Sequence, residues 1–332
     1  MFRLCDSRIG ILLKAAALAL MTLLTSFPIL EQGYASGPPG ADEYQISVDV
    51  GMVVLPVIVT DRKGQVVSGL GAHSFHVFDD GLPQQIAFFE PEDVPVAIGL
   101  VIDNSGSMRS KRQEVVAAAA EFAKSSNSQD QMFVVNFNQT VSMGLPNGVP
   151  FTSDVRQLLG AVSRIPASGN TALYDGLAVA LDHVKTGTTN RKALILISDG
   201  GDNCSRISFR ELLKRAGASN TQIYALGVFD DMFSGKDSSV LKLLAKATGG
   251  KAYFPESPSQ IIGICQQIAR DLRHQYTIGY YPHNPNPGSK YHAIRVTAKG
   301  PADSRLHVST RAGYLMPAEP QTPLPTPAKA SL

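Results

Sequence analysis

The chain has 332 residues, of which 44% are hydrophobic and 17% are charged, and its formal net charge at pH 7 is +2. This composition excludes wholesale disorder, and the length suits one large domain with a smaller one. Because the net charge is small and basic residues are scattered among acidic ones, nucleic-acid binding and membrane-surface binding are disfavoured.

The N-terminus has the order of a secretory signal. Basic residues precede an apolar run over 15–24, and small residues follow at 33–35. We therefore predict a signal peptide over 1–35 and an exported mature chain that is periplasmic, on the cell surface or secreted. An uncleaved anchor helix is the alternative, but the apolar run is short and Pro28 interrupts its continuation. No other segment is predicted to span a bilayer.

Short β-type runs separated by turns occur on both sides of the chain's centre. A Gly/Pro-rich linker over 36–42 leads into a first β-rich segment, 43–93, and a second one covers 273–315. The clearest strands are expected at 45–50, 52–60, 84–89, 276–281, 291–298 and 306–310. So few strands on either side would be marginally stable alone. We expect both flanks to pair into one small β-rich domain, with separate caps at each end as the alternative.

Strands and helices alternate between the flanks, over 94–272. Fully apolar runs at 96–102 and 193–197 are typical of strands buried on both faces. Further strands are expected at 132–137 and 223–228, and helices at 115–123, 155–165, 172–184, 209–218, 240–247 and 258–272. This alternation predicts an α/β fold with a doubly wound, mostly parallel sheet, inserted between the β-rich flanks. The Pro-rich tail, 316–332, is predicted to be disordered.

Oxygen-bearing side chains cluster where the apolar strands end. Asp103, Ser105 and Ser107 alternate directly after the first one, Thr171 precedes a helix, and Asp199 follows the strand at 193–197. Loops at the carboxyl edge of a parallel sheet can meet, and hard oxygen donors suit Mg²⁺, Mn²⁺ or Ca²⁺. Taken alone the pattern is weak, since Ser107 is equally suited to be a helix N-cap.

The combined motifs resemble the von Willebrand factor type A domain family. The resemblance covers about residues 95–272. It rests on Asp-x-Ser-x-Ser at 103–107, Thr171 in Gly-Asn-Thr-Ala-Leu, Ser-Asp-Gly ending at Gly200, and a late helix and turn with Thr-Gly-Gly at 248–250. More loosely, the flanks resemble bacterial exported proteins that carry such a domain between β-rich ends.

The resemblance implies a metal-ion-dependent adhesion site holding one Mg²⁺ or Mn²⁺. Ser105, Ser107 and Thr171 would contact the ion directly, with Asp103 and Asp199 acting largely through water. A carboxylate from an Asp or Glu of a protein partner would complete the coordination. The resemblance also implies that ligation is in some members coupled to movement of the last helix, here 258–272. The expected function is that of a non-enzymatic binding or adhesion protein.

Several other interpretations remain open. One alternative is a purely structural metal, with the β-rich flanks binding the partner. A phosphotransferase of the haloacid-dehalogenase kind would use Asp103 as nucleophile, but it needs an acid two residues later, where this chain has Ser105. The sequence lacks the common hydrolase, zinc-protease and Walker motifs. Among its seven histidines, His73 and His76 are close enough to share a metal, but their place in a β hairpin favours surface side chains. Tyr276, Tyr280 and Tyr281 would suit a sugar-binding face or sheet packing. Cys204 and Cys265 are expected to be unpaired.

Overall fold

The computed structural model describes residues 51–229, 238–283, 291–300 and 306–315. The signal peptide expected over 1–35, the linker 36–42, the strand expected at 45–50 and the tail 316–332 lie outside these residues. Within the described ranges, no helix is both long and apolar enough to cross a membrane.

A six-stranded sheet forms the centre of the α/β part, in the order β10-β9-β8-β5-β6-β7. The pairs from β10 to β6 are parallel, and β7 pairs antiparallel with β6. The strands are β5 (Val96–Asp103), β6 (Gln131–Phe137), β7 (Val141–Met143), β8 (Arg191–Ser198), β9 (Thr221–Gly227) and β10 (Ala252–Tyr253). Every residue of β5 is buried, as expected for a strand covered on both faces.

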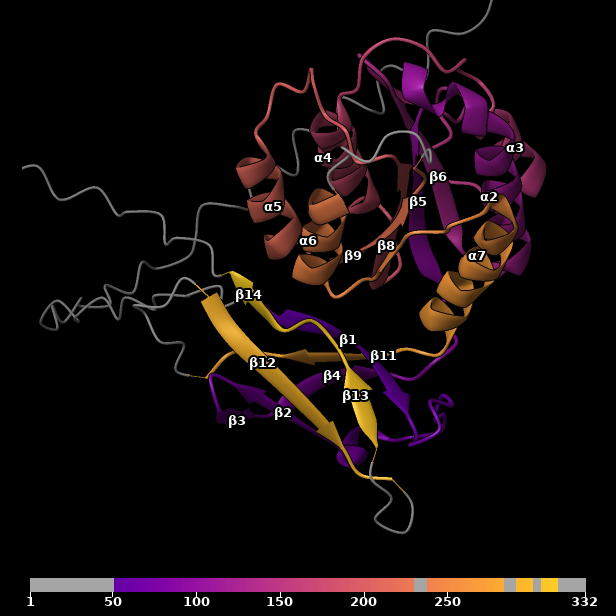
Figure 1. Ribbon diagram of the computed structural model, residues 1–332. Coiled ribbons are helices and arrows are strands. Elements are labelled where there is room, and N and C mark those ends of the chain that lie inside the picture. The colour runs from indigo at the N-terminus through magenta and orange to yellow at the C-terminus, as the bar shows by residue number, and fades with distance from the viewer. Residues whose placement is uncertain (1–50, 230–237, 284–290, 301–305, 316–332) are drawn as a thin grey trace, which may run out of the picture. The chain divides into compact units, whose positions relative to one another are not determined.

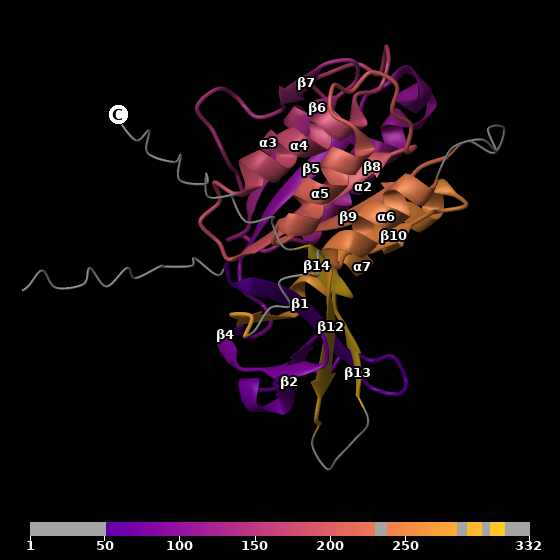
Figure 2. The same cartoon turned by 90° about the vertical axis from the view of Figure 1, so that its left-hand side faces the viewer.

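Two layers of helices cover this sheet (Figure 1, Figure 2). Helices α2 and α3 contact each other and α7 contacts α2, whereas α5 contacts both α4 and α6. The helices are α2 (Arg112–Ser125), α3 (Val155–Val162), α4 (Leu173–Val184), α5 (Phe209–Ala218), α6 (Ser238–Thr248), α7 (Pro258–Arg273) and the short 3₁₀ helix η2 (Gly106–Lys111). Side chains of Asp154 and Ser208 cap the N-termini of α3 and α5. The predicted doubly wound α/β fold is confirmed.

The flanking segments form two four-stranded sheets, in the orders β13-β1-β11-β4 and β14-β12-β2-β3. Their elements are β1 (Val53–Thr60), η1 (Ala72–Ser74), β2 (Phe75–Asp79), β3 (Leu82–Gln84), β4 (Ile86–Glu90), β11 (Tyr276–Tyr280), β12 (Tyr291–Ala298), β13 (His307–Ser309) and β14 (Gly313–Leu315). Each sheet contains strands from both flanks, and both contribute to one apolar core. The expected insertion is confirmed, and separate caps at each end are wrong.

The tyrosines of β11 do not form an exposed aromatic face. Tyr276 and Tyr280 are completely buried in the core of the β-rich domain, and Tyr281, just past the strand, is exposed. The two buried phenols donate hydrogen bonds, to Val67 O and to an Asp79 carboxylate oxygen respectively. Core packing, and not sugar stacking, therefore explains this pattern. Cys204 and Cys265 are free thiols, as expected.

The middle of β5 has no room for a side chain. A methyl group on Gly99 would lie 2.4 Å from Phe133 Cζ and 2.6 Å from Leu194 Cδ2. We expect Gly99→Ala to destabilise the protein by about 1–3 kcal/mol through overpacking, measured by urea unfolding. Gly160→Ala is the matched control, because a Cβ there meets nothing within 4 Å. Equal stabilities of the two variants would contradict this account of the core.

Candidate metal centre

Asp103 and Asp199 reach the same edge of the central sheet because β5 and β8 are parallel neighbours. Ile102 of β5 pairs with Ile197 of β8, so the last residue of β5 lies beside the end of β8. There Ser198 Oγ donates a hydrogen bond of 2.7 Å to Asp103 Oδ2. Asp103 and Asp199 are each only 1% exposed. The parallel register thus brings two buried carboxylates together at the carboxyl ends of the strands.

The loop after β5 brings two serine hydroxyls together. Asp103 Oδ1 accepts a hydrogen bond of 2.8 Å from the Ser105 N–H, which turns the loop over the end of the strand. Ser105 Oγ then lies 3.1 Å from Ser107 Oγ. Ser105 is buried and Ser107 is exposed, so one residue of this hydroxyl pair lies in the interior and the other at the surface. Ser107 lies inside η2, whose N-cap position is Ser105, and so a capping role for Ser107 is wrong.

Backbone hydrogen bonds tie the Thr171 loop to the loop after β5. Ser168 N–H donates to Asn104 O at 2.8 Å, and Gly106 N–H donates to Gly169 O at 3.0 Å. Gly169 has φ +79°, a left-handed conformation that favours glycine. The two loops therefore hold each other through main-chain atoms.

The loop after β8 is tied to Thr171 in the same way. Thr171 N–H donates to Asn203 Oδ1 at 2.8 Å, and Asn203 N–H donates to Thr171 O at 2.9 Å. Asp199 Oδ1 accepts a hydrogen bond from Gly201 N–H at 3.2 Å, within its own loop. Thr171 is 6% exposed. The structure thus places side by side the three loops that carry the residues proposed as metal ligands.

The electrostatics of this edge suit a cation. Burial raises the pKa of Asp103 to about 6, and the nearby Asp199 carboxylate contributes in the same direction, whereas hydrogen bonds from Ser198 and Ser105 oppose the rise. Burying carboxylates is unfavourable unless hydrogen bonds or a cation stabilise them. The donor set is made only of carboxylate and hydroxyl oxygens, which hard divalent cations prefer. By donor chemistry and charge, the residues present fit a divalent ion.

A buried polar network behind the loop was not identified from the sequence. Asn104 is fully buried, and its Nδ2 donates to Asn136 Oδ1 at 2.9 Å. Arg112 donates to Asn104 Oδ1 and also to the carbonyls of Val162 and Ile165. The network connects the loop after β5 to β6 and to the end of α3. One signal was available, since Asn136 is the polar residue within the otherwise apolar run 132–137 of β6.

Residues 98–201 match the family profile described as "von Willebrand factor type A domain". The chain contains a von Willebrand factor type A domain. An uncharacterized protein of Synechocystis sp., sll0103, is 25% identical to this chain over 181 residues, 53% of the chain and 41% of that protein. The chain thus spans about two fifths of the length of this curated relative.

Solved structures with similarity to the chain include other type A domains. The von Willebrand factor type A protein from Catenulispora acidiphila is 15% identical, with a TM-score of 0.49, over 79% of this chain and 73% of that one. Proximal thread matrix protein 1 from the mussel byssus, with a zinc-occupied MIDAS motif, is 18% identical, with a TM-score of 0.44, over 54% of this chain and 48% of that one. The family assignment itself rests on the match over residues 98–201.

Proposed function

We propose that this chain is an exported, non-enzymatic binding protein whose type A domain holds one Mg²⁺ or Mn²⁺ through Asp103, Ser105, Ser107, Thr171 and Asp199. The ion would supply a Lewis-acid position for a carboxylate oxygen of a protein partner. Export is inferred from the basic, apolar and small residues of the N-terminal pattern.

The observation that carries the proposal is the pair of serine hydroxyls. Ser105 Oγ and Ser107 Oγ lie 3.1 Å apart. Adjacent ligands in an octahedron with bonds of 2.0–2.1 Å are separated by about 2.9 Å. Two side chains that alternate in one loop therefore already have nearly the spacing of neighbouring Mg²⁺ ligands.

The hydrogen bonds of the Asp103 carboxylate support an electrophilic ion. Both oxygens of Asp103 already accept hydrogen bonds, from Ser105 N–H and Ser198 Oγ, which suits a role through water. Neutral hydroxyls then provide the direct ligands and leave much of the ion's charge uncompensated. The exposure of Ser107 marks the side from which a partner's carboxylate would approach.

Ser198 is expected to orient Asp103 for metal binding. Its hydroxyl donates to Asp103 Oδ2 and accepts from Gly200 N–H at 3.0 Å. We expect Ser198→Ala to weaken Mg²⁺ binding by about 10–100-fold, the usual range for a residue that supports a ligand. Calorimetric titration measures this, with Ser142→Ala in β7 as the control. Unchanged affinity in Ser198→Ala would contradict this role.

The partner interaction can be tested without knowing the partner. Immobilised protein in Mg²⁺ should retain partners from an extract of the source cells' envelope and secreted fractions and release them on adding EDTA. We expect Asp103→Ala to lose these partners and Asp182→Ala, on the exposed surface of α4, to keep them. Blocking carboxylates in the extract by carbodiimide amidation should also abolish retention. Partners retained by Asp103→Ala in EDTA would contradict the proposal and favour binding through the β-rich flanks.

A further inference from the structure

A second group of possible metal ligands lies in the β-rich domain. Asp79 ends β2, Asp80 is in the turn that follows, and His292 lies in the neighbouring strand β12. One oxygen of each carboxylate and one imidazole nitrogen lie within 4.8 Å of one another. Hydrogen bonds of 2.8 Å in both directions between Asp80 and Ala293 fix the turn beside β12.

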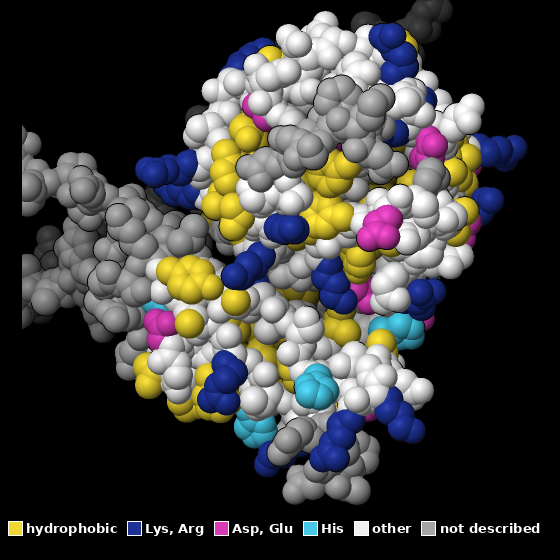
Figure 3. Space-filling model, viewed as in Figure 1, with side chains coloured by type: hydrophobic (Ala, Val, Ile, Leu, Met, Phe, Trp, Pro, Cys, Tyr) yellow, Lys and Arg dark blue, Asp and Glu magenta, His cyan; other side chains and the backbone are white. Residues whose placement is uncertain are grey.

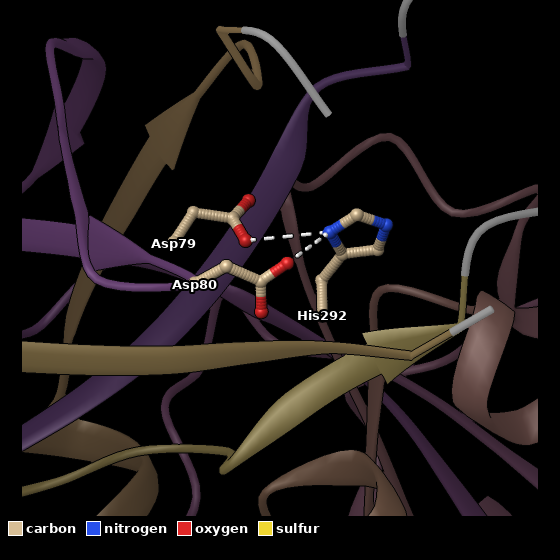
Figure 4. A group of neighbouring side chains, drawn as sticks. All are labelled: Asp79, Asp80 and His292. Carbon is tan, nitrogen blue, oxygen red and sulfur yellow. Dashed lines mark ion pairs between the residues drawn. The ribbon is translucent and has the colours of Figure 1, made fainter. Parts of the chain in front are cut away.

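The distances in this group suit a tetrahedral ion. His292 Nδ1 lies 3.0 Å from Asp80 Oδ2 and 3.6 Å from Asp79 Oδ1. Figure 4 shows both carboxylates turned toward this ring nitrogen. Ligands of a tetrahedral zinc site with bonds of 2.0–2.1 Å are about 3.3 Å apart. The two observed distances lie on either side of that value.

One oxygen of the Asp79 carboxylate lacks a donor. Asp79 Oδ2 accepts hydrogen bonds from Tyr280 Oη at 2.8 Å and from Tyr314 Oη at 2.9 Å. Asp79 Oδ1 is buried and has no hydrogen-bond partner among the described residues. Nδ1 of His292 carries at most one hydrogen, and it lies nearer to Asp80 Oδ2 than to Asp79 Oδ1. This nitrogen therefore does not supply the missing donor to Asp79 Oδ1. A buried carboxylate oxygen without a donor is unfavourable, and a cation at this point would satisfy it.

The surroundings fix the ligands and leave an entry path. The His292 ring is 1% exposed and stacks on the Tyr314 ring, with centroids 5.0 Å apart. The Asp80 side chain is 34% exposed, which opens the group to solvent on one side. An imidazole with carboxylates suits Zn²⁺ and similar transition metals, whereas Mg²⁺ and Ca²⁺ prefer oxygen ligands only. The group therefore differs in kind from the all-oxygen set of the type A domain.

We propose that Asp79, Asp80 and His292 form a second metal site, which takes one Zn²⁺-type divalent cation with water completing its coordination. The cation binds the unprotonated Nδ1 of His292, so any hydrogen on this nitrogen is released to solvent. Asp79 and Asp80 come from the segment before the type A domain and His292 from the segment after it. The ion thus joins the two flanks and stabilises the closed β-rich domain.

The test uses an untagged, EDTA-treated chain carrying Asp103→Ala and Cys204→Ser, so that neither the type A site nor the partly exposed thiol takes up the metal. Titration with Zn²⁺ by calorimetry should give one ion per chain. A tetrahedral Co²⁺ absorption spectrum and a rise in the unfolding temperature with Zn²⁺ should accompany it. His292→Gln and Asp80→Asn are each expected to weaken Zn²⁺ binding at least about tenfold, since they alter ligands and not merely their supports.

Matched controls exist for both variants. His76→Gln changes an exposed histidine of β2. Asp93→Asn changes a carboxylate at another position with positive φ, since φ is 59° at Asp93 and 47° at Asp80. Asparagine tolerates this backbone conformation. Both controls should bind Zn²⁺ as the parent chain does. The proposal is overturned if the parent binds no Zn²⁺, or if Asp80→Asn and His292→Gln, folded in EDTA by circular dichroism, bind it with unchanged affinity.

Discussion

Replacing Asp103 with alanine is expected to abolish the one-to-one binding of Mg²⁺ or Mn²⁺ that calorimetry should detect in the EDTA-treated wild-type chain. The Asp103 carboxylate orients Ser105 through the backbone N–H and accepts from Ser198 Oγ, so alanine removes both a charge and the loop's anchor. Thr171→Ala removes one hydroxyl but keeps the backbone hydrogen bonds of its loop. We therefore expect it to weaken Mg²⁺ binding less than Asp103→Ala does.

The control is Asp182→Ala, whose carboxylate is exposed in α4 and pairs with Lys185. It should bind the ion like the wild type. Equal affinity of the wild type and Asp103→Ala would show that any bound Mg²⁺ lies elsewhere, and the proposed adhesion site would then be wrong. Circular dichroism of both variants separates loss of the site from loss of the fold.

The fold was predictable where apolar patterns are long. The run at 96–102 identified β5, and the pattern at 209–218 identified α5 with its exact bounds. Short edge strands were not predicted, because β7 and β14 have three residues each and β10 has two, too few to show a period. The segment at 84–89 belongs to two strands, β3 and β4, which an apolar pattern cannot divide.

The closeness of Asp103 and Asp199 was predictable because both lie at the ends of apolar strands that pair in parallel, whereas Thr171 lies in the loop before α4. Parallel pairing of β5 with β8 brings Asp103 and Asp199 to the same edge of the central sheet. The Asn104–Asn136–Arg112 network depends on side-chain packing, and Asn136 within an apolar run is the one local signal of it in the sequence. The Asp79–Asp80–His292 group depends on the pairing of β2 with β12, whose residues are more than 200 positions apart in the sequence. Spacing between histidines could not reveal it, because its other ligands are carboxylates.

Asp103→Asn is expected to raise the stability of the metal-free protein while removing its stabilisation by Mg²⁺. Burial raises the pKa of Asp103 from its ordinary 3.8 to about 6. A carboxyl group whose pKa is raised by folding opposes folding once it is ionised in the native state. The difference between these two pKa values corresponds to a destabilisation of the native state of at most about 3 kcal/mol at pH 7.5. In EDTA, asparagine should therefore increase the free energy of unfolding, because it keeps the shape of the side chain without the charge.

The pH and metal dependence together distinguish this explanation from a simple packing effect. The gain in EDTA should shrink as the pH falls through about 6 and vanish below the ordinary pKa of 3.8, where the native carboxyl is protonated. In Mg²⁺ at a hundred times its dissociation constant, the wild type should gain about 2.7 kcal/mol and Asp103→Asn nothing. Urea unfolding in EDTA and in Mg²⁺ measures both effects. Lower stability of Asp103→Asn than of the wild type, in EDTA at pH 7.5, would mean that the buried carboxylate supports the fold. Its proposed role as a metal ligand whose charge opposes folding would then be wrong.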